Sequence, residues 1–301
     1  MNRYLIAPVL SALLACVVFG DAPGVSAQSG ANYTVDANWA RLPAGTTWNG
    51  NTSWITADGK GQVVVLVRTA PYFRVLTRDG AFVKAFGDEG LFQSAHSVTI
   101  DAQGALWVTD SAAHLVYTFS PDGRLLMTLG KKGVAGDNTS RDLFNQPNHV
   151  ALAPSGDIYV SDGYVNARVV HFSRDGHFVR IIGGVKGSRP GQLQLPHGVA
   201  LDSRGRILVN DSDNQRVSVF DKDGTFVEAW PYASRGGIAV AADDTVYISD
   251  VNAGIVNIMK NGKLIDSVSA DRAHGMGIDT DGAIYVSGAS RMTVMKITRG
   301  R

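Results

Sequence analysis

Cysteine is almost absent from this sequence of 301 residues. The one cysteine, Cys16, lies in an apolar N-terminal segment, so the rest of the chain has no thiol for a disulfide or a cysteine–metal site. A large hydrophobic core must therefore hold the fold together, and a hydrophobic content of 45% is sufficient for one. An excess of charge of one sign is also missing, because 28 Lys and Arg face 27 Asp and Glu. This balance argues against nucleic acid as a partner and favours a small molecule or a peptide.

Long apolar runs are confined to the N-terminus. Residues 1–27 have the order of a secretory signal peptide, with a basic start, an apolar stretch and Val25-Ser26-Ala27 as the cleavage site. We therefore expect a mature chain that begins at Gln28, has no membrane span and is secreted or periplasmic. A lipid anchor on Cys16 is the alternative, because Leu13-Leu14-Ala15-Cys16 resembles a lipoprotein cleavage box.

The common catalytic signatures are missing as well. The sequence contains no H-E-x-x-H helix, no paired cysteine motif and no G-x-S-x-G elbow. The Gly-rich stretch 183–187 lacks the Lys-Ser/Thr ending of a phosphate-binding loop, so we interpret residues 137–142 and 183–191 as rim loops.

What the sequence does contain is one pattern repeated along the chain. Each repeat is predicted to form a four-stranded meander. It consists of an alternating apolar run, a Gly turn, a run ending in Asp, a third run, an Asp-Gly turn and a fourth run. The mean repeat is about 44 residues, which is typical of a propeller blade. First strands are predicted to begin near Ile55, Val98, Val150, Val199, Ile238 and Met276. We therefore predict an all-β, six-bladed β-propeller that forms a single domain over residues 28–301.

The last repeat stops after its third strand, near Thr298. Its missing fourth strand is predicted to come from residues 33–42, which would close the ring and shield the strand edges. Five dipeptides between third and fourth strands are predicted to form type I′ turns, with positive φ at both central residues. They are Asp79-Gly80, Asp122-Gly123, Asp175-Gly176, Asp223-Gly224 and Asn261-Gly262.

Histidine recurs in one structural position. The residues that precede the six first strands are Ser53, His96, Asn148, His197, Gly236 and His274. Histidine thus fills every second place, and on a six-bladed ring those places are about 120° apart around the channel. Three converging imidazoles with an open fourth position are typical of catalytic zinc. The alternative is that repeat duplication left incidental histidines in the channel.

The remaining histidines are interpreted as structural. His114 and His171 lie in or beside third strands, and His177 follows an Asp-Gly turn. His149 comes one residue after the ring position and is a candidate for a further polar group in the channel. Asp110, Asp162, Asp211 and Asp250 end the second strands, where we expect them to cap loops rather than bind metal.

Three segments carry a family resemblance: Gln146–Val150, Tyr159–Arg168 with its Ser-Asp-Gly-Tyr element, and Pro190–His197. They resemble NHL-repeat propellers, and especially the peptidyl-α-hydroxyglycine α-amidating lyases. The resemblance implies that His96, His197 and His274 hold a catalytic zinc, that Tyr164 is the catalytic tyrosine and that Arg68 is the first active-site arginine. The implied reaction converts a peptide with a C-terminal α-hydroxyglycine, a carbinolamide, into a peptide amide and glyoxylate.

Two positions depart from that family's pattern. The second active-site arginine is matched by Ser212, and the acidic calcium ligand that follows the third histidine is matched by Gly275. The departures put calcium in doubt and leave the exact substrate open. In the implied mechanism Tyr164 acts as a phenolate, which requires nearby positive charge, from Arg68, to lower its pKa from about 10.

Three functions follow as hypotheses. The first is a monomeric, exported zinc lyase that acts on a small carbinolamide or a peptide C-terminus. The second is a non-enzymatic NHL-type module that binds a peptide, glycan or protein. A lactonase-like hydrolase is the third, and the histidines argue against it because a hard cation prefers carboxylate and amide oxygens.

Overall fold

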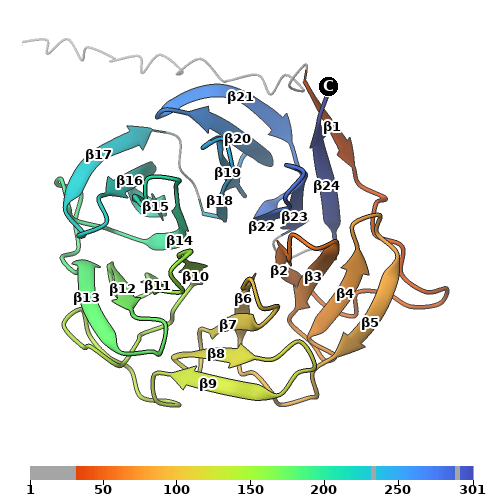
Figure 1. The fold of residues 1–301 in the computed structure, drawn as a ribbon, viewed down its shortest axis with the longest axis horizontal. Coiled ribbons are helices and arrows are strands. Elements are labelled where there is room, and N and C mark those ends of the chain that lie inside the picture. The colour runs from red at the N-terminus through yellow and green to blue at the C-terminus, as the bar shows by residue number, and fades with distance from the viewer. Residues whose placement is uncertain (1–31, 232–234, 289–291, 301) are drawn as a thin grey trace, which may run out of the picture.

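The computed structural model describes residues 32–231, 235–288 and 292–300. The predicted signal peptide, with Cys16, lies outside these residues. Within them the chain forms six antiparallel four-stranded sheets arranged around a central axis (Figure 1). This is the predicted six-bladed β-propeller. None of its described elements is a helix of the length and apolarity needed to cross a bilayer.

Each blade is a meander whose first strand lies at the channel and whose fourth strand lies at the outside (Figure 1). Blade 1 contains β2 (Thr52–Ala57), β3 (Gln62–Val67), β4 (Phe73–Thr77) and β5 (Phe82–Phe86). Blade 2 contains β6 (Ala95–Ile100), β7 (Leu106–Asp110), β8 (Leu115–Phe119) and β9 (Leu125–Leu129). Blade 3 contains β10 (His149–Leu152), β11 (Ile158–Asp162), β12 (Arg168–Phe172) and β13 (Phe178–Gly183).

The second half of the ring repeats this order. Blade 4 contains β14 (Pro196–Leu201), β15 (Ile207–Asp211), β16 (Arg216–Phe220) and β17 (Phe226–Pro231), with the short 3-10 helix η1 (Ser212–Asn214) after β15. Blade 5 contains β18 (Ile238–Val240), β19 (Val246–Asp250), β20 (Ile255–Lys260) and β21 (Lys263–Ser269). Blade 6 contains β22 (Ala273–Ile278), β23 (Ile284–Gly288), β24 (Val294–Arg299) and, from the other end of the chain, β1 (Tyr33–Asp36).

The ring closes where β1 pairs antiparallel with β24. Tyr33 lies opposite Arg299, and Asp36 lies opposite Lys296, so the predicted closing strand is confirmed. It is shorter than residues 33–42 because the chain then turns inward at Trp39. The Trp39 indole is 3% exposed, packs 5.0 Å from the Tyr285 ring and donates to the Arg78 carbonyl at 2.8 Å. Burial of this aromatic side chain ends the strand pairing.

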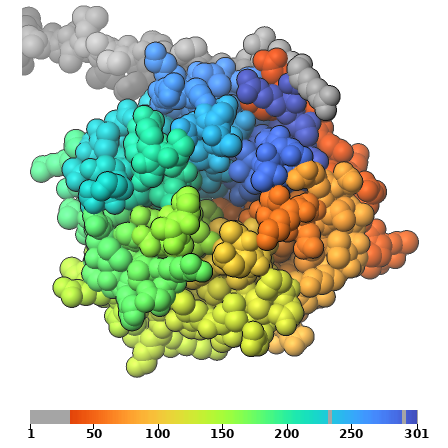
Figure 2. All heavy atoms as spheres, in the orientation of Figure 1, coloured from red at the N-terminus to blue at the C-terminus, as the bar shows by residue number. Residues whose placement is uncertain are grey.

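Hydrophobic residues pack between the blades rather than at the axis. Six buried clusters lie one at each interface between neighbouring blades, and Figure 2 shows the blades in direct contact around the ring. Inner strands are therefore buried on both faces, which explains continuous apolar runs such as Val63–Val67. The channel itself contains mainly polar side chains, with Trp54 as a buried apolar side chain among its histidines.

The prediction of type I′ outer turns is wrong for four of the five. In these four only the glycine has positive φ, between 82° and 89°: Gly80, Gly123, Gly176 and Gly224. In the first of them the Gly80 N–H donates to the Thr77 carbonyl at 2.8 Å, and the pairing of β4 with β5 shifts by one residue beside it. This is a type I turn followed by a G1 bulge, which also needs glycine. Asn261 and Gly262, at φ 50° and 75°, form the one predicted type I′ turn.

Candidate metal centre and catalytic pocket

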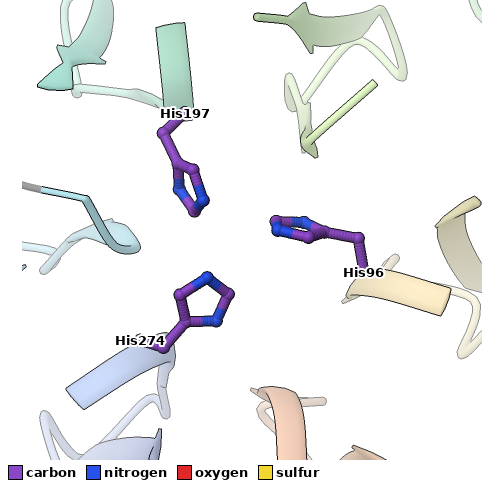
Figure 3. A group of neighbouring side chains, drawn as sticks. All are labelled: His96, His197 and His274. Atoms are coloured by element: carbon purple, nitrogen blue, oxygen red, sulfur yellow. The ribbon is translucent and has the colours of Figure 1, made fainter. Parts of the chain in front are cut away.

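Three histidines meet in the channel. His96, His197 and His274 come from the inner strands β6, β14 and β22 of alternate blades, and their rings point toward one another (Figure 3). Their candidate ligand atoms all lie within 4.8 Å of one another. The side chains are buried, with exposures of 1%, 1% and 8%. The three histidines, which occupy matched positions in every second repeat, thus meet at one point, as the repeat pattern predicts.

The backbone of the next blade orients each imidazole. Nδ1 of His96, His197 and His274 lies 2.7, 3.1 and 2.9 Å from a carbonyl oxygen. The carbonyls belong to the intervening ring positions, Asn148, Gly236 and Ser53. A carbonyl can only accept, so Nδ1 carries the proton and Nε2 keeps its lone pair. This is the outer-shell arrangement that fixes histidine as a metal ligand through Nε2.

Burial keeps the three imidazoles neutral. It lowers the pKa of His96 and His197 well below the usual value, and the neighbouring histidines lower them further. For His274 burial lowers the pKa to about 4, while the hydrogen bond to Ser53 opposes the shift. Three neutral imidazoles with free Nε2 atoms, and no carboxylate in the described cluster, fit a borderline-soft cation such as zinc.

These shifts predict that acid destabilises the metal-free protein. His274 has a pKa of about 4 in the fold, against 6.5 in the unfolded chain, so between these two values the unfolded chain binds more protons. The free energy of unfolding is therefore highest above pH 6.5 and falls progressively as the pH drops toward 4. His274 alone accounts for about 3 kcal/mol. Urea unfolding of the metal-free chain between pH 7 and pH 4 measures the loss. An unfolding free energy that is constant over this interval would contradict the prediction.

Tyr164 enters the same space from the loop after β11. Its hydroxyl lies 2.8 Å from Nε2 of His96 and 3.4 Å from Nε2 of His197. Because Nε2 is the unprotonated nitrogen, the phenol donates to His96. In the metal-free protein burial raises the pKa of Tyr164, while Arg68, Arg235 and Asn148 lower it. Arg68 thus acts in the expected direction, but in the metal-free protein desolvation of the phenolate raises the pKa more than the cations lower it. A low pKa in the zinc-bound site stays a prediction.

A buried network fixes the loop that carries Tyr164. The Asp162 carboxylate pairs with Arg168 at 2.9 Å and accepts from the Asn145 N–H at 2.8 Å. The Gly163 N–H donates to Oδ1 of Asn148 at 2.8 Å. The amide nitrogen Nδ2 of Asn148 is buried without a hydrogen-bond partner, and its interaction with Tyr164 lowers the pKa of the phenol. Asp162 thus caps a loop, as its position after a strand suggested, and Asn148 is a polar contact of Tyr164 that the sequence did not single out.

A pocket of about 360 Å³ opens above the histidines. Arg68 lines it and is held there by a 3.2 Å hydrogen bond from Nε to Oγ of Ser53. Arg235 and Arg272 line it as well, and neither was among the site residues predicted from the sequence. Both lie on connections between blades, where the repeat has no fixed length, so position matching had no signal for them. Tyr164, His197 and His274 also reach this pocket.

Trp54 forms the floor of the site. It follows Ser53 on β2, is 0% exposed, and its ring centroid lies 5.4 to 6.2 Å from those of the three histidines. His149 stacks on it at 4.6 Å, and the two ring nitrogens of His149 already contact Val199 and Thr99. His149 is thus a polar group of the channel wall that lies outside the three-histidine cluster.

A second pocket, about 550 Å³, opens at the opposite ends of the inner strands.

The structure leaves no space for the missing calcium ligand. A Cβ atom at Gly275 would lie 2.5 Å from Cα of Trp54 and 2.9 Å from the carbonyl oxygen of Ser53. Blade 6 packs its inner strand directly on the backbone of blade 1, so an acidic side chain cannot enter here. Ser212, at the position of the second arginine, is buried. The residues present do not fit the family's calcium site.

Gly275→Asp is therefore expected to destabilise the fold rather than to create a calcium site. Overpacking against backbone and burial of an unpaired carboxylate predict a loss of about 3 kcal/mol or more. Denaturant unfolding with and without calcium measures it. Gly300→Asp is the control, because Gly300 is exposed, lacks the positive φ that favours glycine, and a Cβ there meets nothing closer than 3.4 Å. Recovery of stability on addition of calcium would contradict the prediction.

Comparison with known proteins agrees with the fold and the repeats. The NHL repeat model matches residues 144–172 and 193–220, which lie in blades 3 and 4. Solved structures of similar fold include a streptogramin B lyase, with a TM-score of 0.62 and 14% identity over 91% of this chain and 100% of that one. Virginiamycin B lyase from Staphylococcus aureus has a TM-score of 0.64 and 14% identity over 88% and 99%. At this identity the likeness concerns the fold alone.

Sequence relatives are more informative. Peptidylglycine alpha-amidating monooxygenase of Rattus norvegicus is 32% identical over 74% of this chain, which spans 25% of the relative's length. A probable peptidyl-alpha-hydroxyglycine alpha-amidating lyase of Caenorhabditis elegans is 29% identical over 74% of this chain and 69% of its own length. NHL repeat-containing protein 3 of Homo sapiens is 32% identical over 66% and 59%. The chain is a six-bladed β-propeller that contains NHL repeats in blades 3 and 4 and is similar in sequence to proteins named as peptidyl-α-hydroxyglycine α-amidating lyases.

Proposed function

We propose that this chain is an exported zinc-dependent lyase that converts a peptidyl α-hydroxyglycine into a peptide amide and glyoxylate. One observation carries the proposal: three buried, neutral imidazoles present free Nε2 atoms beside the hydroxyl of Tyr164. Sequence relatives named as amidating lyases support it. We also propose that residues 1–27 are a signal peptide and that residues 28–301 act as one monomeric domain.

The residues present fit the metal. His96, His197 and His274 would hold zinc through Nε2, with their Nδ1 protons anchored on backbone carbonyls. Zinc bound there supplies a Lewis acid that makes the substrate hydroxyl more acidic. The pocket above it, lined by Arg68, supplies a cation for the carboxylate of the hydroxyglycine.

Tyr164 is the proton carrier in this proposal. As phenolate it takes the proton of the substrate hydroxyl, the electron pair freed from the O–H bond forms the second C–O bond of glyoxylate, and the C–N bond breaks with its electrons moving to nitrogen. The same phenol then returns the proton to the leaving amide nitrogen, so no water is consumed. Arg68, Arg235 and the free amide N–H of Asn148 favour the phenolate against the cost of burial.

Direct assay tests the proposal. The chain from Gln28 onward is loaded with zinc, its metal content is measured by mass spectrometry, and glyoxylate release from an N-acyl-α-hydroxyglycine is followed. The N-acylglycine without the hydroxyl is the control substrate. About one zinc per chain and glyoxylate release only from the hydroxylated compound are expected. A fully zinc-loaded chain that releases no glyoxylate would overturn the lyase proposal.

A second candidate is a binding propeller without catalysis. Two observations favour it: Ser212 stands where the family has an arginine, and Gly275 excludes the family's calcium ligand. Its expected result is a folded chain that retains no stoichiometric zinc after reconstitution.

A further inference from the structure

The pocket above the histidines is unusually rich in guanidinium groups. Arg68, Arg235 and Arg272 all line it, and none of the other described lining residues is an aspartate or glutamate. Asp213, which pairs with Arg235, and Asp271, which precedes Arg272 in the chain, are not among the lining residues. Three cations beside a site for a metal cation constitute a strongly anion-attracting cavity.

Among the residues that the structure describes, one ion pair involves these arginines, and it does not neutralise their charge. Arg235 pairs with Asp213 at 3.7 Å, and their side chains are 57% and 43% exposed. A long, solvent-exposed pair of this kind interacts weakly and exchanges readily for a ligand. Arg68 donates from Nε to the neutral hydroxyl of Ser53, so its charge is also available. The pocket therefore has more positive charge than a single substrate carboxylate requires.

Arg272 differs from the other two in position and backbone. It lies in the turn between β21 and β22, two residues before His274, in which the Ala273 N–H donates to the Ala270 carbonyl at 3.1 Å. Its φ is 47°, in the left-handed region that favours glycine or asparagine. A long cationic side chain is thus kept at a position where the backbone disfavours it, at the rim of a binding pocket. Strain of this kind is typical of functional positions.

Arg68 and Arg235 have a different role from Arg272. Arg68 donates to Oγ of Ser53, and Arg235 directly precedes Gly236 in the chain. The carbonyls of Ser53 and Gly236 orient His274 and His197, so these two cations lie beside the reacting centre. A single carboxylate on the hydroxyl-bearing carbon can accept from both of them. Arg272 is then left for a group farther along the substrate.

We propose that the site selects substrates with a second anionic group on the acyl side of the hydroxyglycine, and that Arg272 binds this group. The first anionic group is the carboxylate of the hydroxyglycine, so in this respect the inference rests on the proposed function. The substrate class is an acidic N-acyl-α-hydroxyglycine, such as a peptide with a penultimate Asp or Glu or a small dicarboxylic carbinolamide.

Two unreactive probes of equal shape test this selectivity by binding alone. N-succinylglycine carries two carboxylates, and N-succinamoylglycine replaces the distal one with a neutral amide. Neither has the α-hydroxyl, so neither can be cleaved. Calorimetry with the zinc-loaded chain is expected to give about tenfold or more tighter binding of N-succinylglycine at low salt, and a smaller ratio at high salt.

Two variants separate the effect of the charge from that of the backbone. Arg272→Asn removes the charge while asparagine tolerates the left-handed backbone, and it should reduce the affinity ratio to about one. Arg272→Lys should retain most of the preference. Melting temperatures confirm that the variants fold. Equal affinity of the native chain for the two probes, failure to bind either, or an unchanged ratio in Arg272→Asn would overturn the inference.

Glyoxylate release is measured separately, on N-succinyl- and N-succinamoyl-α-hydroxyglycine. Binding preference without cleavage of either compound would reject the lyase and leave the anion selectivity standing. Cleavage of both compounds with equal kcat/KM and equal probe affinity would reject the selectivity and leave the lyase standing.

Discussion

His197→Ala is expected to abolish both stoichiometric zinc binding and glyoxylate release. Nε2 of His197 is one of three candidate ligands, and the side chain is buried at 1% exposure, so no solvent-exposed group can take its place. Loss of an outer-shell partner alone typically costs 10- to 100-fold in metal affinity or activity. Loss of a ligand should cost about a thousandfold or more in both. Equilibrium dialysis against a zinc buffer measures the first quantity, and glyoxylate release measures the second.

Two other histidines provide controls of graded severity. His177→Ala removes an exposed imidazole and should change neither quantity. His149→Gln alters a buried imidazole that stacks on Trp54 beside the cluster, and it should reduce stability while zinc stoichiometry stays at one. Retention of zinc and activity by His197→Ala would show that the metal centre lies elsewhere. Equal zinc loss in His149→Gln would show that general disruption of the channel is responsible.

Tyr164→Phe is expected to reduce kcat/KM by about 10²- to 10⁴-fold, the usual contribution of a positioned proton-transfer group. The variant removes the hydroxyl that lies 2.8 Å from Nε2 of His96, but leaves the ring contacts of Tyr164 with His96 and His197. Zinc content should therefore remain about one per chain. Initial rates at several substrate concentrations, together with metal analysis of the same preparation, separate loss of chemistry from loss of metal.

Tyr159→Phe is the matched control for this prediction. Tyr159 lies on β11, five residues before Tyr164, and stacks on His171 at 4.3 Å, away from the metal cluster. Its replacement should leave kcat/KM unchanged. Activity of Tyr164→Phe equal to that of the native chain would remove the phenol from the mechanism, and another group would have to move the proton.

Periodic features of the fold could be predicted because each depends on the repeat. The six first strands, the closing pair β1 and β24, and the convergence of His96, His197 and His274 all follow from residues at matched positions. Tyr164 was found by its motif, and it reaches the cluster. Arg68 reaches the same pocket. The blade sets a residue's angle around the axis, and its position within the repeat sets its distance from the axis, so little tertiary information was needed.

Features that depend on one particular contact could not be predicted. The burial that raises the pKa of Tyr164 is a tertiary property, and the free amide of Asn148 is visible only in a hydrogen-bond network. Arg235 and Arg272 lie on connections whose lengths vary between blades. The turn type at the Asp-Gly pairs depends on whether the strand pairing shifts by one residue, and the dipeptide alone does not determine that.

The pairing of β1 with β24, the first and last strands of the chain, has a consequence for the order of folding. β1 begins at residue 33 and pairs with a strand that ends at residue 299, so this pairing forms only when nearly the whole chain is available. Such a non-local contact is expected to form late. His274 lies in the blade that this pairing completes, and its Nδ1 contacts the Ser53 carbonyl across the interface between the last blade and the first. The three histidines are therefore brought together by ring closure, and an ion bound to them would stabilise the closed ring by about 4 kcal/mol at a thousand times its dissociation constant.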